Sequence, residues 1–237
     1  MLKIENWEVV GWEHAIRGMR NPMNSWEKSD SYRYWGCDEV GNHCTEAKFE
    51  VGDADFDLMT RLRNAGTDHR KFMRMITVYL DITAPLYWWK EFDTYKVGTV
   101  ANSCSTMHKI HAKEFTLEDF STEHLMGLDD HGPLPYASDI TSIFDFHALM
   151  EDIIEVLNNA RAWYLETKDK KYWWQMIQLL PTSYNQKRTV ELNYEVLANI
   201  YKSRRNHKLD EWHTLCDWIE KLPYSELITG GEKKDEA

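Results

Sequence analysis

The chain has 237 residues and a formal net charge of −11, from 28 Lys and Arg against 39 Asp and Glu. This acidic balance argues against a general affinity for nucleic-acid backbone or for an anionic membrane surface, although a local pocket could still bind one small anionic ligand. With 43% apolar and 13% aromatic residues, the chain has the composition of a folded globular protein.

The lack of a recognisable targeting signal and the small number of cysteines favour a cytoplasmic protein. The N-terminal segment MLKIENWEVVGWEH has no uninterrupted apolar core typical of a signal peptide, and no apolar run is long enough to span a bilayer. The four cysteines form no CxxC pair, so reduced thiols are expected. Cys37, His43 and Cys44 are metal-ligand residue types, but an adjacent His-Cys pair is poor chelate geometry. We favour a small hairpin with buried cysteines and expect no metal site.

The first half of the chain predicts a hairpin, a helix, a strand and a short helix. Residues 31–52 alternate aromatic and polar side chains, which indicates a hairpin. Residues 53–66 begin with Asp, place Phe56, Met59 and Leu62 on one helical face, and end at Gly66. Residues 75–82 have the β-branched alternation of a strand. Pro85 then begins a helix that continues to Phe92.

The second half predicts four helices. The longest, about 140–166, has apolar residues at intervals of three and four, namely Ile143, Phe146, Met150, Ile153, Leu157 and Ala160. Further helices are predicted over 171–180, ended by Pro181, and over 190–204 and 208–223. The predicted class is mixed α/β with helices dominant. We expect one domain over 1–228 and a disordered tail over 229–237.

Familiar catalytic motifs are absent from the sequence, which contains no GxGxxG, GxxxxGK[ST], HExxH or GxSxG pattern. Three polar residues, Asn193, Asn199 and Arg204, stand within the helix predicted over 190–204. At about 100° per residue, Asn193 and Arg204 would share a face, about 16 Å apart, which suits the two ends of an extended ligand. Solvated polar residues on an amphipathic helix would give the same pattern.

A family resemblance covers the C-terminal half. The segment LLPTSYNQKRTVELNYEVLANIYKSR (179–204) and the later Glu211-Trp212 resemble the flavin-dependent thymidylate synthases, also called the thymidylate synthase complementing family. That family has a Leu-Pro, an Asn twelve residues later, an Arg eleven residues after the Asn, and then a Trp. Pro181, Asn193, Arg204 and Trp212 reproduce this order.

The N-terminal half agrees with this resemblance. The segment AIRGMR (15–20) resembles an early Ala-x-Arg-x-x-Arg segment of the family, and AGTDHRKFMRMITVYLDITAP (65–85) places His69 on a motif histidine. The segment TYKVGTVANSCST (94–106) then aligns without gaps with the signature Arg-His-Arg-x-x-Ser-x-x-Glu-x-Ser-x-Arg. The resemblance extends over most of residues 15–225, and its spacings match better than its identities.

The resemblance implies a flavin-dependent thymidylate synthase-like fold, a homotetramer, and binding of FAD and a pyrimidine nucleotide. In the family, a methyl or one-carbon group is transferred to dUMP for dTMP biosynthesis, and NADPH and methylenetetrahydrofolate would be needed here only if this activity is retained. No catalytic residue is assigned, because the family's protein mostly positions reactants around the cofactor. The residues implied to bind cofactor are His69, Arg74, Lys96, Thr99, Asn193 and Asn199. Those implied to bind substrate are Glu91, Asn102, Ser103, Cys104, Ser105 and Arg204.

The sequence departs from the family pattern mainly at positions where the family has charged side chains that bind its ligands. Thr94, Thr106 and Ile177 stand where the family has arginines, and Arg74 stands where it has a flavin-contacting Glu. Hydrogen bonds to charged groups contribute about 1.5–3 kcal/mol each, so three lost arginines would cost about 5–9 kcal/mol, or about three to six orders of magnitude in affinity. Lys96 and Arg204 would recover part of this loss, and we expect dUMP to bind more weakly than in the family.

Several residues also have simpler interpretations. The pairs Trp88-Trp89 and Trp173-Trp174 favour core or interface packing over base stacking, and KSRRNHK (202–208) favours a solvated helix end. Nothing in the sequence places a base beside Cys104, so we assign it no nucleophilic role. Two functions therefore stay open: a divergent flavin enzyme, or an inactive homologue that uses the fold to bind a partner protein.

Overall fold

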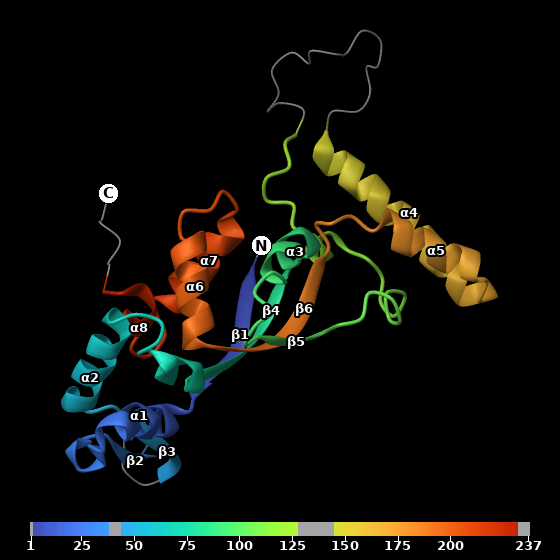
Figure 1. Cartoon of the computed structure of the whole chain (residues 1–237). Coiled ribbons are helices and arrows are strands. Elements are labelled where there is room, and N and C mark those ends of the chain that lie inside the picture. Colours follow the sequence, from blue (N-terminus) through green and yellow to red (C-terminus); the bar gives the residue numbers. More distant parts are fainter. Residues whose placement is uncertain (1, 38–43, 128–144, 232–237) are drawn as a thin grey trace. The chain divides into compact units, whose positions relative to one another are not determined.

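The computed structural model describes residues 2–37, 44–127 and 145–231 (Figure 1). Its strands are β1 (Lys3–Val10), β2 (Tyr32–Cys37), β3 (Cys44–Glu50), β4 (Thr77–Pro85), β5 (Val100–Ser103) and β6 (Asn185–Asn193). Its helices are α1 (Trp12–Arg20), α2 (Asp53–Asn64), α3 (Leu86–Phe92), α4 (Phe146–Thr167), α5 (Lys170–Leu179), α6 (Tyr194–Arg204), α7 (Asp210–Ile219) and α8 (Glu226–Thr229). No helix in these ranges is both long and apolar enough to cross a bilayer.

The strands form two sheets. The larger has the order β1-β4-β6-β5, so that β6, late in the chain, lies between β4 and β5. The smaller is the antiparallel pair β2-β3, with Tyr32 opposite Glu50 and Cys37 opposite Cys44. The hairpin predicted over 31–52 is confirmed. His43, the third residue of the possible metal group, lies outside the described residues.

The central strand β4 follows directly from its sequence. Val78, Leu80 and Ile82 are fully or almost fully buried, whereas Tyr79 between them is exposed, as expected for side chains that alternate between the two faces of a sheet. Pro85 ends the strand in an extended conformation and is the N-cap of α3. The predicted strand and the helix that follows it are therefore confirmed.

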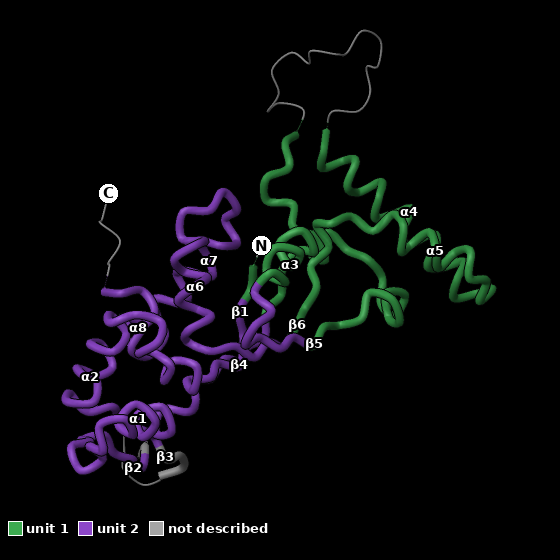
Figure 2. Tube along the Cα trace, in the orientation of Figure 1, with its two compact units in different colours: residues 1–3, 82–94, 102–188 green, residues 4–81, 95–101, 189–237 purple. Residues whose placement is uncertain are grey.

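The described residues group into two compact units, shown in green and purple in Figure 2. Unit 1 comprises 1–3, 82–94 and 102–188, and unit 2 comprises 4–81, 95–101 and 189–237. The single domain expected over 1–228 stays a prediction, and residues 232–237 of the expected tail lie outside the described part of the chain.

Unit 1 has its core along α4 and α5, which pack against each other (Figure 1). The buried cluster comprises Ile110, Phe115, Phe120, Met150, Leu157, Ala160 and Met176. Ile177, which takes the place of a family arginine, packs against this cluster. Trp88 and Trp89 are buried and in ring contact, so their interpretation as core residues is confirmed. Phe146 is 37% exposed, so its predicted place in the core is wrong, because it is the first residue of α4.

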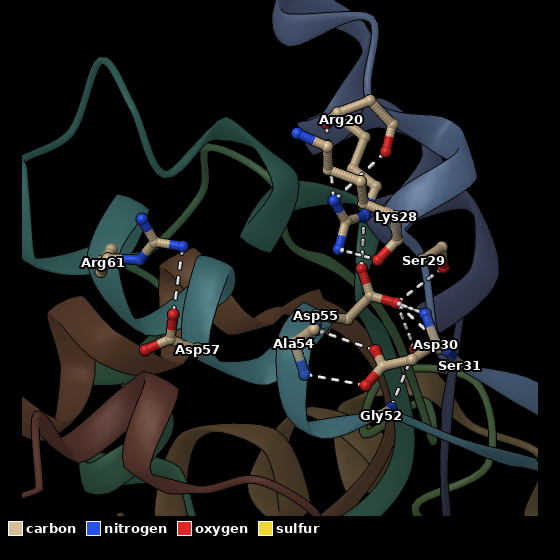
Figure 3. A network of polar contacts seen from close by, with 11 residues as sticks. Arg20, Lys28, Ser29, Asp30, Ser31, Gly52, Ala54, Asp55, Asp57 and Arg61 are labelled. Atoms are coloured by element: carbon tan, nitrogen blue, oxygen red, sulfur yellow. Dashed lines mark hydrogen bonds and ion pairs between the residues drawn. The ribbon is translucent and has the colours of Figure 1, made fainter.

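Unit 2 contains a buried network of polar contacts, which we call the Arg20–Asp55 network (Figure 3). Asp55 of α2 is fully buried and accepts a hydrogen bond of 2.6 Å from Nε of Arg20 at the end of α1. Its other oxygen accepts hydrogen bonds of 2.6 Å from the hydroxyls of Ser29 and Ser31. Asp30 in turn accepts from the backbone N–H groups of residues 54 and 55, and so caps the N-terminus of α2.

The boundary between β6 and α6 differs from the prediction. Residues 190–193 were expected to begin a helix, but they are the last residues of β6, and α6 begins at Tyr194. Val190 and Leu192 are both buried, which is the two-residue period of a strand. The local sequence Val-Glu-Leu-Asn therefore alternates as a strand and ends at a helix cap, and the predicted helix is wrong over these four residues.

Candidate functional site

Four predicted site residues of unit 2 belong to α6, its N-cap or the loop of residues 95–99, namely Lys96, Thr99, Asn193 and Arg204. Gly98 in this loop has a φ of 77°, in the left-handed region that favours glycine. A Cβ on Gly98 would lie 3.0 Å from Nδ2 of Asn193 and 3.3 Å from Cγ2 of Val196. The loop therefore approaches the first turn of α6 closely, and this contact depends on glycine at position 98.

Asn193 is the N-cap of α6. Its Oδ1 accepts a hydrogen bond of 3.1 Å from the backbone N–H of Val196, which is one of the unpaired donors of a helix N-terminus. Its backbone is extended, with φ −129° and ψ 169°. The expectation that Asn193 and Arg204 share a helical face assumed a helix through residue 193, and that assumption is wrong. The structure shows that Asn193 caps α6. Its binding of the cofactor stays a prediction.

Arg204, at the C-terminal end of α6, contacts two aromatic side chains. Its Nε donates a hydrogen bond of 3.0 Å to the hydroxyl oxygen of Tyr95. Its guanidinium lies 4.8 Å from the ring centre of Trp212 and 5.7 Å from that of Tyr95. The Trp212 ring is fully buried, and a guanidinium held over aromatic rings in this way keeps its charge while its orientation is fixed.

The loop beside this arginine carries two predicted cofactor residues. Lys96 is exposed, and Thr99 is half-buried. In the described part of the chain, Oγ1 of Thr99 is buried and has no hydrogen-bond partner. An unsatisfied buried hydroxyl costs about 1–3 kcal/mol, so a ligand that supplied a partner would recover this energy. Lys96, Thr99 and Arg204 thus offer charge and hydrogen bonding that suit an anionic nucleotide.

Three other predicted cofactor residues lie apart from this group. Asn199 lines a cavity of about 700 Å³, together with Lys202 and Arg205. His69 lines a cavity of about 500 Å³ with Asp68, Lys71, Phe72 and Met75, among others. Arg74 is exposed. Their roles in flavin binding stay predictions.

The predicted substrate residues other than Arg204 fall in unit 1. Asn102 and Ser103 are exposed on the short strand β5. Cys104 and Ser105 line a cavity of about 280 Å³ that also contains Lys109 and Lys113. Cys104 is an exposed free thiol, and its backbone is fixed by hydrogen bonds to Lys187 and from Gln186.

Glu91 is half-buried in α3, and its carbonyl oxygen accepts hydrogen bonds from the backbone and hydroxyl of Thr94. Thr94, which takes the place of a family arginine, therefore helps to end this helix. Its hydroxyl, at 2.8 Å from the carbonyl, is used for a local contact.

Sequence reasoning missed the most ordered polar groups of unit 2. Asp55 was included only among the acidic residues that open a helix, although Asp55 and Arg20, 35 residues apart, form the buried pair. In the alignment of residues 94–106 with the family signature, Tyr95 takes the place of the histidine, and the sequence gives no sign of its contact with Arg204, 109 residues away. A charged residue at a position that the helical period places inside, such as Asp55 next to Leu58 and Met59, is the signal that could have found the first pair.

Comparison with known proteins identifies the fold. No protein-family model and no curated protein matches the sequence. The flavin-dependent thymidylate synthase ThyX of Helicobacter pylori, solved in complex with FAD and dUMP, matches with a TM-score of 0.61 and 16% identity, over 98% of this chain and 99% of that chain. The chain has the fold of a flavin-dependent thymidylate synthase.

A second match supports this conclusion. The UMP/dUMP methylase PolB of Streptomyces cacaoi, bound with 5-Br dUMP, is 14% identical, with a TM-score of 0.58 over 97% of this chain and 95% of that chain. The α/β fold class with dominant helices that the sequence resemblance implied is therefore confirmed, and so is the long helix, which the structure shows as α4. Residues 140–144 of the predicted helix, which include Ile143, lie outside the described residues. In this thymidylate synthase-like fold, α6 and the loop of residues 95–99 carry the polar group built around Arg204.

Proposed function

We propose that this protein binds FAD and a pyrimidine nucleotide, as a divergent flavin-dependent thymidylate synthase-like enzyme. The observation that carries the proposal is the group formed by Arg204, Tyr95 and Trp212 beside the loop of residues 95–99. This loop bears Lys96 and the hydroxyl of Thr99, which has no hydrogen-bond partner within the described part of the chain. Two solved proteins of this fold bind nucleotides of this class, dUMP in one and 5-Br dUMP in the other.

The residues of the chain would act by binding and orientation. Bound flavin supplies hydride transfer, which side chains cannot perform. Arg204 would donate charge-assisted hydrogen bonds to an anionic group, while Trp212 and Tyr95 limit the movement of its guanidinium. Lys96 would neutralise further phosphate charge. If one-carbon transfer to dUMP is retained, methylenetetrahydrofolate would provide the carbon and NADPH the hydride, in the cytoplasm.

Calorimetric titration of dUMP and UMP into FAD-loaded protein tests the proposal. We expect saturable binding of at least one nucleotide, and we expect Arg204→Ala to weaken it about 10–100-fold, since a hydrogen bond to a charged group is lost. Arg61→Ala is the matched control, because Arg61 is an exposed arginine of α2 paired only weakly with Asp57. Absence of binding by both nucleotides, or equal affinity in Arg204→Ala, would contradict the proposal.

We also propose that the protein is a homo-oligomer, with a tetramer implied by the resemblance. Leu149, Val156 and Trp163 recur at seven-residue spacing along α4 and are 40%, 49% and 52% exposed. Residues seven apart lie on one helical face, so they form an apolar stripe that a second copy would cover. Light scattering after gel filtration should show a tetramer. Val156→Lys should dissociate it, whereas Glu155→Lys, on a neighbouring face, should not.

A second function, a non-catalytic interaction module, is supported by another surface. Trp26, Tyr32 and Trp35 in unit 2 are 50%, 56% and 67% exposed, and large exposed aromatic side chains are typical of protein interfaces. Under this alternative the protein would bind no flavin, and Trp35→Ala would abolish capture of a partner while Arg204→Ala would leave it unchanged.

A further inference from the structure

Unit 2 contains a cavity of about 270 Å³ lined by α1, by residues 26–33 and by the hairpin β2-β3, and we call it the hairpin cavity. Helix α1 lines it with Glu13, Ile16, Arg17 and Arg20. These four residues recur at intervals of three and four, so they share one face of the helix. As far as the structure describes the chain, none of the residues implied to bind FAD or a nucleotide lines this cavity. A ligand in the hairpin cavity would therefore be separate from both.

Apolar and aromatic side chains form part of the cavity wall. Ile16 is buried, Phe49 is half-buried, and Trp26 and Tyr32 are 50% and 56% exposed. The indole N–H of Trp26 donates a hydrogen bond of 2.7 Å to Oδ1 of Asn21, which fixes the orientation of this ring. Exposed aromatic rings beside a cavity provide apolar surface that the ring of a ligand would cover.

Three arginines line the hairpin cavity, and the chain supplies partners for two of them. Arg20 donates to Asp55 and to two backbone carbonyls (Figure 3). Arg33 donates hydrogen bonds of 2.9 and 2.5 Å to Oε2 of Glu13. Arg17, by contrast, donates no hydrogen bond and forms no ion pair within the described residues. Its guanidinium is therefore available to an anionic group of a ligand.

Glu13 brings a hydrogen-bond acceptor to the same cavity. Both hydrogen bonds from Arg33 end at Oε2, and Oε1 accepts none from the residues that the structure describes. The hydrogen bonds and the charge of Arg33 hold the pKa of Glu13 below its ordinary value, so this carboxylate is ionised at neutral pH. Glu13 and Arg17 are four residues apart in α1, and such residues are neighbours on a helix surface. The cavity therefore presents an open anion beside an open cation.

We propose that the hairpin cavity binds a free α-amino acid with an aromatic side chain, at a site separate from the proposed nucleotide site. Arg17 would donate to the α-carboxylate, because the guanidinium fork matches the two oxygens of a carboxylate. Glu13 would accept from the α-ammonium, and the ring would pack against Trp26 and Tyr32. Drug-sized ligands occupy pockets of about 300–1,000 Å³, so a cavity of about 270 Å³ suits a smaller molecule with one ring.

Calorimetric titration of the full chain with L-phenylalanine and with two analogues that keep its ring tests this proposal. The analogue 3-phenylpropionate lacks the ammonium group, and phenethylamine lacks the carboxylate. We expect L-phenylalanine to bind, and each analogue to bind about 10-fold or more weakly, because each loses one charged group that forms hydrogen bonds.

The variant Arg17→Gln isolates the contact with the carboxylate. It should weaken binding of L-phenylalanine about 10-fold or more, but it should leave the affinity for phenethylamine, which has no carboxylate, unchanged. Arg17 is exposed, so an unchanged melting temperature without ligand should show that the fold is kept. Arg61→Gln is the matched control, because Arg61 is an exposed arginine of α2 that does not line the hairpin cavity.

The outcomes separate this site from the proposed nucleotide site. Arg204→Ala should leave the affinity for L-phenylalanine unchanged, whereas a loss in this variant would place the amino acid at Arg204 and overturn the proposal. Equal affinity for L-phenylalanine and 3-phenylpropionate would remove the role of Glu13 and contradict binding of an amino acid. No binding of L-phenylalanine at millimolar concentration, or unchanged affinity in Arg17→Gln, would also contradict the proposal.

Discussion

The Arg20–Asp55 network and the region around α6 both concentrate charged and polar groups in unit 2, but they use them differently. Arg20 directs its donors at Asp55 and at the backbone carbonyls of Ser25 and Lys28, so the chain itself supplies its partners. Around α6, arginines and a lysine line a cavity, and the buried hydroxyl of Thr99 has no hydrogen-bond partner among the residues that the structure describes. The comparison teaches that a buried charge whose donors meet partners from the chain has a structural role, whereas a buried polar atom that the described residues leave unpaired is available to a ligand.

Asp55→Ala should have the largest effect on stability. The substitution would leave the guanidinium of Arg20, which is 4% exposed, without its carboxylate, and breaking a buried pair in this way costs about 3–5 kcal/mol. Asp57→Ala is the control, because Asp57 pairs with Arg61 at the surface, where such pairs contribute about 0–1 kcal/mol (Figure 3). Urea unfolding measures both, and equal effects would refute the structural role of the network.

The ionisation of Asp55 predicts that the stability of the fold depends on pH. Burial raises the pKa of Asp55, but hydrogen bonds from Ser29, Ser31 and Arg20 together outweigh it and hold the pKa below its ordinary value. Because the folded pKa is depressed, this stabilisation is fully present above the unfolded pKa of about 3.9 and is lost as pH falls through the folded value.

The free-energy difference between wild type and Asp55→Asn, measured by urea unfolding from pH 6 to pH 3, should therefore shrink as pH falls below about 4. A difference that is constant across this range would show that the ionisation of Asp55 does not stabilise the fold.

Gly98→Ala tests whether the loop of residues 95–99 approaches the first turn of α6 closely. A left-handed φ in a residue with a side chain costs about 1–3 kcal/mol, and the new Cβ would also press on Asn193. Gly66→Ala is the control, because Gly66 has a φ of 109° and no atom within 4 Å of the Cβ position. A greater loss of stability in Gly98→Ala, by thermal unfolding, would confirm the close approach of the loop to α6; equal losses would show that the contact contributes nothing.

Substitutions of Asn193 should have the smallest effect on stability. Asn193→Ala removes the N-cap of α6 and should cost about 1 kcal/mol, whereas Asn193→Asp keeps an acceptor for the N–H of Val196 and should be nearly neutral. Thermal unfolding measures both variants. If Asn193→Asp retains stability but loses FAD affinity, then Asn193 contacts the cofactor as well as capping the helix.

The elements predicted correctly from the sequence are those whose apolar residues recur at a short and regular spacing. The hairpin of residues 31–52, the strand β4 and the long helix α4 all follow patterns of two or of three and four residues. It misplaced the start of α6, because Leu192 and Asn193 are compatible with a helix until the pairing of β6 in the sheet is known.

The missed contacts are those between distant segments. Arg20 meets Asp55, Tyr95 meets Arg204, and Arg63 meets Leu227 only in the folded chain. The family resemblance correctly implied the fold, because spacing preserves the order of elements. The partners of individual arginines depend on tertiary packing, which spacing alone does not encode.

The visible absorbance spectrum of the purified protein, before and after addition of FAD, tests the central claim most directly. We predict that added FAD stays with the protein through gel filtration and shows the shifted absorbance bands of a bound flavin, and that Arg61→Ala behaves in the same way. A protein that stays colourless after incubation with excess FAD would contradict the proposal that this thymidylate synthase-like fold holds a flavin.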